Sequence, residues 1–167
     1  MRSLTHLSPD HVSGSSLRSR KEVPAAECWD LSKLYADDVA WENELERYRG
    51  LSQKIPSFKG TLGQSAASLA AALAFLRDFG MLEERLAAYA SLREAEDQGL
   101  STARDRSARF MRKQAEAQAA WSYLDPEIQA IPADRMAAFL GDPALAEFKV
   151  WLHKVLRFRP HVLSEKE

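Results

Sequence analysis

Apolar side chains recur along most of the chain at spacings of three and four residues, which predicts amphipathic helices. The first stripe begins after the capping acids Asp37 and Asp38 and ends before Pro56. Its members are Trp41, Leu45, Tyr48 and Ile55. We therefore expect one helix between the acids and the proline, with this stripe facing the core.

A second and longer stripe predicts a helix from Ser65 to about Glu96, with the serine hydroxyl as the N-cap acceptor. Gly80 lies inside this stretch and is a candidate interruption, because glycine is a poor helix former. The stripe before this glycine consists of Leu69, Leu73, Leu76 and Phe79. Leucines, Tyr89 and Ala90 continue the pattern after it.

A third helix is predicted after the turn at residues 97–100. Ser101 or Thr102 is expected to cap it, and its pattern reaches Leu124. Several alanines in its second half favour the helix and permit the close approach of a neighbour. Its candidate core positions are Phe110, Gln114, Ala117, Trp121 and Leu124.

Two acid–proline pairs predict further helix starts, because a capping acid before a proline at the first helical position is typical of an N-terminus. The pairs are Asp125-Pro126 and Asp142-Pro143, and a short helix centred on Met136–Leu140 lies between them. The last predicted helix carries Leu145, Phe148, Leu152 and Val155 on one face.

The fold class that follows is all-α. No run of strand length alternates with a period of two, and β-branched residues are scarce. Because short turns separate the helices, sequential helices are expected to pack antiparallel, as a bundle or hairpins of about five to six helices. This helical domain is assigned to residues 25–167.

Residues 1–24 differ in composition from the rest of the chain. They hold six serines, Gly14 and a basic patch at Arg18, Arg20 and Lys21, without apolar periodicity. Such a segment cannot offset the entropy of ordering by burial, so a disordered N-terminal arm is expected.

Overall composition narrows the class of protein. The chain has 23 basic and 24 acidic side chains and a formal net charge of −1, which argues against a nucleic-acid surface. The longest strongly apolar stretch, Ala66–Leu76, is too short to span a bilayer, so no membrane partner is expected. A single cysteine, Cys28, excludes an internal disulfide and fits a reducing, cytoplasmic location.

The residues that usually carry chemistry do not assemble into a recognisable site. His6, His11, His153 and His161 form no H-E-x-x-H pair, and His153 is interpreted as a surface residue. No catalytic residue, no metal ligand and no cofactor is therefore assigned to this chain. Substrate-binding residues remain unidentified by the sequence.

Three acidic groups invite the idea of paired catalytic carboxylates. They are Glu83-Glu84, Glu94-Glu96-Asp97 and Glu42-Glu44-Glu46. Each lies beside an arginine, Arg85, Arg93 or Arg47, so they are interpreted as solvated helix faces with local ion pairs. The four tryptophans, at positions 29, 41, 121 and 151, fall on or beside apolar faces and are expected to pack in the core.

Several segments, taken in order, resemble a known family. They are Trp29-Asp30-Leu31-Ser32-Lys33-Leu34-Tyr35, Phe58-Lys59-Gly60-Thr61-Leu62, Tyr89-Ala90-Ser91-Leu92 with Asp97, Leu124-Asp125-Pro126-Glu127-Ile128, Ile131-Pro132, and the stretch from Leu156 to Glu167 that contains Arg159-Pro160-His161. Together they resemble the N-terminal region of oligoendopeptidase F, one of the thimet-like zinc oligopeptidases, over residues 28–167.

The resemblance implies a helical N-terminal domain that packs over a larger catalytic domain and restricts the access of short peptides to a channel. In that family an H-E-x-x-H helix and a later glutamate hold zinc, and the glutamate of the motif activates water. No position of this chain matches that motif. Zinc and peptide substrates are therefore expected for the parent protein, and this chain alone is expected to be inactive.

The last residues bear on the same expectation. Ser164 and Glu167 have the spacing of a capping box, which fits either the start of a helix or an acidic, frayed C-terminal tail. Because these residues also resemble a junction in that family, truncation before the catalytic domain is the favoured interpretation. The surfaces that could dock on that domain are residues 69–89 and 115–120, which serve equally well as ordinary core. The alternative is a non-enzymatic helical protein–protein interaction module, and an exposed docking face would predict self-association.

Overall fold

The computed structural model describes residues 20–161. The chain divides into two units, Met1–Asp30 and Leu31–Glu167. Most of the expected disordered arm, residues 1–19, lies outside the described residues, as does the capping box formed by Ser164 and Glu167.

The described part of the first unit contains two single turns of 3-10 helix, η1 (Arg20–Glu22) and η2 (Ala25–Glu27). The Cys28 Sγ accepts a hydrogen bond from Arg20 Nη1 at 2.9 Å and donates one to the Pro24 carbonyl at 3.3 Å. Trp29 is 63% exposed, so the prediction that all four tryptophans pack in a core is wrong for this residue.

Six α-helices and four short 3-10 helices make up the described part of the second unit. The α-helices are α1 (Asp38–Ser52), α2 (Ala66–Glu96), α3 (Ser101–Ala120), α4 (Leu124–Ala130), α5 (Ala133–Gly141) and α6 (Lys149–Arg157). The 3-10 helices are η3 (Leu31–Lys33), η4 (Ile55–Phe58), η5 (Pro143–Phe148) and η6 (Arg159–His161). Residues 20–161 contain no strand, and the predicted all-α class is confirmed.

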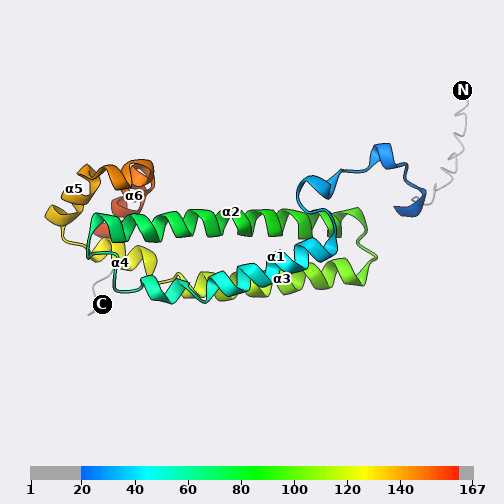
Figure 1. Cartoon of the computed structure of the whole chain (residues 1–167), viewed down its shortest axis with the longest axis horizontal. Coiled ribbons are helices and arrows are strands. Elements are labelled where there is room, and N and C mark those ends of the chain that lie inside the picture. The colour runs from blue at the N-terminus through cyan, green and yellow to red at the C-terminus, as the bar shows by residue number, and fades with distance from the viewer. Residues whose placement is uncertain (1–19, 162–167) are drawn as a thin grey trace, which may run out of the picture. The chain divides into compact units, whose positions relative to one another are not determined.

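Helices α1, α2 and α3 lie side by side and alternate in direction, as predicted for helices joined by short turns (Figure 1). Helices α4, α5 and α6 gather at the end where α2 begins. No helix in the described part of the chain is long and apolar enough to cross a membrane.

One core lies between α1, α3 and the C-terminal half of α2. Trp41, Tyr48 and Leu86 are fully buried at its centre, and the indole Nε1 of Trp41 donates to the Leu86 carbonyl at 3.0 Å. Tyr48 stacks on Phe79 with ring centroids 4.5 Å apart. The other members of this core are Tyr35, Leu45, Ile55, Leu82, Tyr89, Ala90, Phe110 and Ala117.

A second core joins the N-terminal half of α2 to the C-terminal helices. Leu69 and Leu73 of α2 meet Leu145 of η5 and Leu152 of α6 there. The remaining buried members are Leu62, Ala66, Ala72, Leu124, Ile128, Ile131, Met136, Phe139 and Val155. The apolar stripe proposed as a docking face on α2 is therefore mostly ordinary core.

Helix α2 spans both cores without a break. Its 31 residues extend roughly 46 Å at the α-helical rise per residue. Gly80 lies within it, so the expectation of an interruption there is wrong. Phe79 and Leu82 are buried on either side of this glycine and hold the helix against the first core. Packing on both sides outweighs the weak helix propensity of one residue.

The predicted N-caps of α1 and α2 are confirmed. The Asp37 carboxylate accepts from the Ala40 N–H at 2.8 Å, and the Ser65 hydroxyl accepts from the Ser68 N–H at 3.0 Å. The N-cap predicted for α3, Ser101 or Thr102, is wrong: the helix begins at Ser101, and Leu100 occupies the N-cap position without a side-chain hydrogen bond.

Three other boundaries differ from the sequence patterns. α1 ends at Ser52, so Ile55 reaches the same core from η4 and not from α1. α3 ends at Ala120, and Leu124 opens α4 with Asp125 inside its first turn and not at its N-cap. Asp142 does cap as predicted, but it begins η5: its carboxylate accepts from the Ala144 N–H at 2.8 Å.

Substitution of Gly80 tests the continuity of α2. A Cβ at this position meets no atom within 4 Å, so Gly80→Ala is expected to raise the free energy of unfolding by about 0.5–1 kcal/mol. Gly60→Ala also meets no atom, but Gly60 has a φ of +80°, and the same change is expected to cost about 1–2 kcal/mol. Urea denaturation of both variants measures the difference. Destabilisation by Gly80→Ala would contradict a continuous helix.

Candidate functional site

The segments that carry the family resemblance meet at two junctions, one in each core. At the first junction the loop after η4 is fixed by a single carboxylate from α4. Glu127 accepts from the Gly60 N–H at 2.8 Å and from the Leu62 N–H at 2.9 Å. Gly60 permits the positive φ that this loop requires. The chain segments 58–62 and 124–128 therefore form one unit, although 65 residues separate Leu62 from Glu127.

Other side chains bind backbone carbonyls around the same loop. Tyr123 Oη donates to the Ile55 carbonyl at 2.7 Å, and burial together with the Glu127 charge raises the pKa of Tyr123 to about 12. Arg135 donates to the Gly63 carbonyl at 3.1 Å. Arg159 donates to the Ile131 carbonyl, which ties the Arg159-Pro160 segment to the turn after α4.

The second junction ties together the start of α1, the end of α2 and the start of α3. Asp38 accepts from Tyr89 Oη at 2.8 Å and pairs with Arg106 Nη2 at 2.5 Å. Arg106 is 7% exposed, and its guanidinium lies over the rings of Trp41 and Tyr89. Burial and the hydrogen bond to Asp38 raise the pKa of Tyr89 to about 12. Its ring meets Tyr35 edge-on, at 5.5 Å between centroids.

Glu83 does not form the solvated ion pair that the sequence pattern predicted. It accepts from Tyr48 Oη of α1 at 2.5 Å and from Gln114 Nε2 of α3 at 3.0 Å, so it links all three helices. Burial and the bond to Glu83 raise the pKa of Tyr48. Arg85 instead donates to the Leu34 carbonyl at 2.8 Å and lies over the Tyr35 ring.

The other acidic groups include the local ion pairs that were expected. Glu44 pairs with Arg47 at 3.1 Å, and Glu96 pairs with Arg93 at 2.5 Å. Glu46 pairs with Arg49 at 2.8 Å. These pairs span three residues on one helix, where an exposed pair contributes little stability.

The side chains considered as catalytic residues or metal ligands do not come together in the described part of the chain. His153 is exposed on α6, as predicted, and flanked one turn away by Lys149 and Arg157. His6 and His11 lie outside the described residues. Among residues 20–161, no group of three or more histidine, cysteine, aspartate or glutamate side chains could hold a metal ion.

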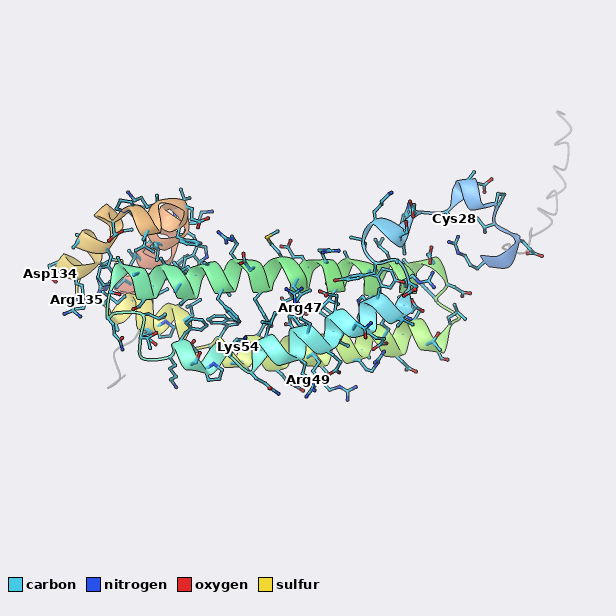
Figure 2. All side chains as sticks on the ribbon, in the orientation of Figure 1. Cys28, Arg47, Arg49, Lys54, Asp134 and Arg135 are labelled. Atoms are coloured by element: carbon cyan, nitrogen blue, oxygen red, sulfur yellow. The ribbon has the colours of Figure 1, made fainter. Side chains whose placement is uncertain are left out.

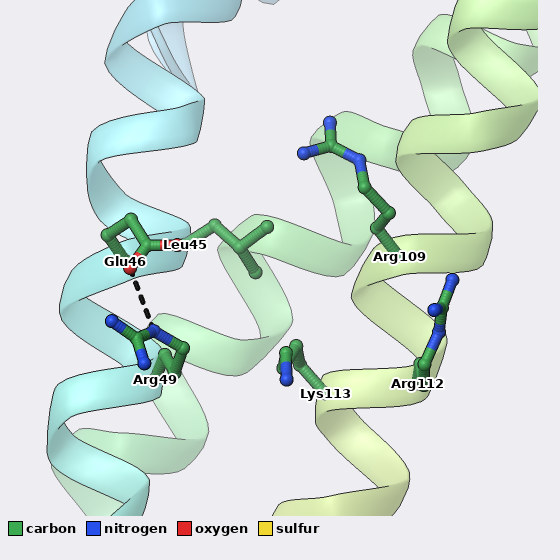
Figure 3. Close-up of a pocket in the computed structure, with 6 residues that line it drawn as sticks. All are labelled: Leu45, Glu46, Arg49, Arg109, Arg112 and Lys113. Carbon is green, nitrogen blue, oxygen red and sulfur yellow. Dashed lines mark hydrogen bonds and ion pairs between the residues drawn. The ribbon is translucent and has the colours of Figure 1, made fainter.

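Two of the surface grooves of the second unit lie between packed helices. One runs between α1 and α3 and is lined mostly by basic side chains (Figure 3). The other, of about 350 Å³, lies between α2 and the segment η5–α6 and is lined by Leu76, Phe148 and Trp151, with Arg77 and Glu147 bridging it at 2.6 Å. Figure 2 shows that Arg49 and Lys54 come from α1 and the turn after it, whereas Arg135 lies on α5.

Sequence reasoning missed the basic groove and the junction carboxylates. The spacing of Arg109, Arg112 and Lys113 places three cations on one face of a helix, and this signal was available in the sequence. Glu83 and Glu127 gave no such signal. Their partners lie on other helices and are brought together only by the tertiary fold.

Comparisons with known proteins find similarity to oligopeptidase F and to related peptidases. The family model described as Oligopeptidase F matches residues 127–167. Oligopeptidase PepF of Bacillus subtilis is 32% identical over 156 residues, which are 92% of this chain and 23% of that protein. The chain spans between 23% and 25% of the length of four curated relatives and 14% of the length of a fifth.

Solved structures share the fold. A chain from Chlamydophila abortus superposes with a TM-score of 0.82 over 90% of this chain and 26% of its own length, at 23% identity. Oligoendopeptidase-F from Enterococcus faecium superposes with a TM-score of 0.68 over 77% of this chain and 26% of its own, also at 23% identity.

The fold and these matches define an all-α region that recurs as one part of longer proteins, peptidases among them. The particular resemblance, to the N-terminal region of oligoendopeptidase F, is confirmed.

Removal of the Glu127 carboxylate tests the first junction. Glu127→Ala leaves the N–H groups of Gly60 and Leu62 without their acceptor, so we expect the free energy of unfolding to fall by about 1–3 kcal/mol. Glu116→Ala is the matched control, since Glu116 is exposed and pairs with Lys113 on the same helix, and it is expected to cost less than about 0.5 kcal/mol. Equal effects of the two changes in urea denaturation would contradict the role of Glu127.

The raised pKa of Tyr89 predicts a loss of stability at high pH. The folded state holds this proton up to about pH 12, whereas the unfolded state releases it near pH 10.0. The protonated Tyr89 side chain therefore makes its full contribution to the free energy of unfolding below the pKa of the unfolded state. This contribution is lost as the pH rises through the pKa of the folded state. Tyr89→Phe removes the titrating group, so its unfolding free energy should fall less steeply across this range.

Denaturation curves of both proteins, measured from about pH 9 to about pH 12, provide the test. At neutral pH the variant should be less stable by about 1 kcal/mol, because the bond to Asp38 is lost. Parallel curves above pH 10 would show that Tyr89 does not titrate differently in the two states.

Proposed function

We propose that this chain is the N-terminal helical cap domain of a longer zinc oligoendopeptidase that hydrolyses short peptides. In this proposal residues 25–167 form the cap domain, which restricts access to the channel that leads to the catalytic centre. The cap domain itself performs no chemistry.

The observation that carries the proposal is the pattern of coverage. The match to the Bacillus subtilis peptidase takes in 92% of this chain but only 23% of that protein. The same quarter-length match recurs with an oligopeptidase of Streptococcus agalactiae and an oligoendopeptidase of Lactococcus lactis. A chain similar to one quarter of a peptidase is expected to supply one part of its architecture.

The packing of the second unit supports a restricting role. A cap domain must exclude folded proteins by shape, and this requires a body that does not deform. Both cores share α2. Glu83 hydrogen-bonds to α1 and α3, and Glu127 fixes the loop before α2. These bonds join elements distant in sequence, so bending one helix would break contacts in several others.

Zinc in the parent protein is part of the proposal, and this chain's residues do not fit the metal. The described part of the chain offers no group of three nitrogen, sulfur or carboxylate ligands close together. The metal, which would polarise the peptide carbonyl and activate water, is therefore assigned to the catalytic domain. No residue of this chain is given a role in that step. The single cysteine supports a cytoplasmic location as a further part of the proposal.

The test compares two proteins: the 167-residue chain and a version extended through its open reading frame. The extended protein is expected to contain an H-E-x-x-H motif, to bind zinc stoichiometrically and to cleave a quenched fluorescent peptide of bradykinin size. The 167-residue chain is expected to do neither. Metal analysis and fluorescence measure the two properties.

Two outcomes would contradict the proposal. Chelator-sensitive cleavage by the 167-residue chain alone would place the chemistry within it. A reading frame that ends without the zinc motif would favour the helical interaction module instead.

A further inference from the structure

The groove between α1 and α3 concentrates positive charge on a chain whose net charge is −1. It encloses about 210 Å³. Figure 3 shows its two walls: α1 presents Arg49 and Glu46, and α3 presents Arg109, Arg112 and Lys113. Leu45, which is 6% exposed, contributes an apolar surface to the lining. Four cations thus share the groove with one carboxylate.

Arg112 forms no ion pair with the described residues. Among residues 20–161 no carboxylate pairs with its guanidinium, and the side chain is exposed beside the groove. The N–H groups of an unpaired guanidinium can donate two parallel hydrogen bonds to the two oxygens of a carboxylate. Arg112 can therefore accept an external anion without first breaking an ion pair.

Two other cations have partners that are easily exchanged. Arg49 binds Glu46, and Lys113 binds Glu116 at 2.9 Å, each three residues away on the same helix. The side chains of Arg49 and Glu46 are 51% and 66% exposed. Water screens pairs of this kind, so an incoming carboxylate can replace the internal one at little cost.

Arg109 has a different role, because it fixes the spacing of the two walls. It donates two hydrogen bonds across the groove to Glu42 of α1 and lies over the Trp41 ring. These bonds to Glu42 raise the pKa of Arg109. The walls are thus held together by a bidentate pair, while the cations further along the groove stay available.

We propose that this groove binds an acidic segment of a separate polypeptide, with its carboxylates on Arg112, Lys113 and Arg49. The charge pattern favours such a peptide over a nucleic acid. An adjoining hollow shares Arg109 and Arg112 but also contains Glu42 and Asp105, and Glu116 lies beside Lys113. A continuous row of phosphates would meet these acids, whereas an acidic peptide with neutral residues between its carboxylates avoids them. This inference goes beyond the proposed function and does not rest on it.

Fluorescence anisotropy with the 167-residue chain tests the inference directly. The probe is a short fluorescein-labelled peptide of alternating glutamate and serine, and the same peptide with glutamine in place of glutamate is the neutral control. We expect saturable binding of the acidic probe and none of the neutral one. Binding should weaken markedly between about 50 mM and about 300 mM NaCl, because the shorter Debye length screens exposed charges.

Matched variants locate the binding to the groove. The double variant Arg112→Gln with Lys113→Gln should weaken binding about fivefold, and Arg49→Gln on the opposite wall about twofold. Arg104→Gln is the control, because Arg104 is an exposed arginine that lies on the same helix but does not line the groove. Loss of its charge should change the affinity less than loss of the charges on either wall of the groove. Circular dichroism checks that all variants retain their helices.

Three outcomes would overturn the proposal. The first is the absence of saturable binding of the glutamate peptide. The second is an equal effect of Arg104→Gln and of the double variant, which would mean that general positive charge and not this groove attracts the probe. The third is tighter binding of a single-stranded oligothymidylate of equal length, which would assign the groove to nucleic acid.

Discussion

The burial of opposite ends of one helix in two different cores is the constraint on which the second unit depends. The N-terminal half of α2 packs against η5 and α6, and its C-terminal half packs against α1 and α3. Burial of each large apolar side chain contributes about 1.5–3 kcal/mol, so each half of α2 is held by several such residues. A break in α2 at Gly80 would uncouple the two cores. The helix continues through Gly80, so the two cores remain joined.

Partly buried carboxylates then fix the positions of the loops and helices that apolar packing alone leaves free. Apolar contacts have little directional preference, whereas a hydrogen bond to a carboxylate requires a defined geometry. Glu127 holds the loop before α2, Glu83 joins α2 to both neighbouring helices, and Asp38 joins Tyr89 to Arg106. A body fixed in this way suits both a cap domain that excludes folded proteins and a groove with a constant width.

The sequence predicted those parts of the fold that depend on neighbours along the chain. The N-caps Asp37 and Ser65 each bind a backbone N–H three residues away, so local spacing was enough to find them. The core stripes were found for the same reason. Asp125 was misassigned because Tyr123 and Leu124 continue helical geometry before it, and no local pattern distinguishes the two starts.

The sequence by itself therefore determined the helical class, the core-facing stripes and the resemblance to a peptidase family. Tertiary structure alone decided which acids are solvated, because Glu83 and Glu44 look alike in sequence but only Glu83 bonds to side chains on two other helices. It also decided where the basic groove lies. Three of its cations share one face of α3, but the opposite wall comes from α1, about 60 residues away in the chain. Side chains so distant in sequence become neighbours only when burial of the apolar stripes aligns their helices.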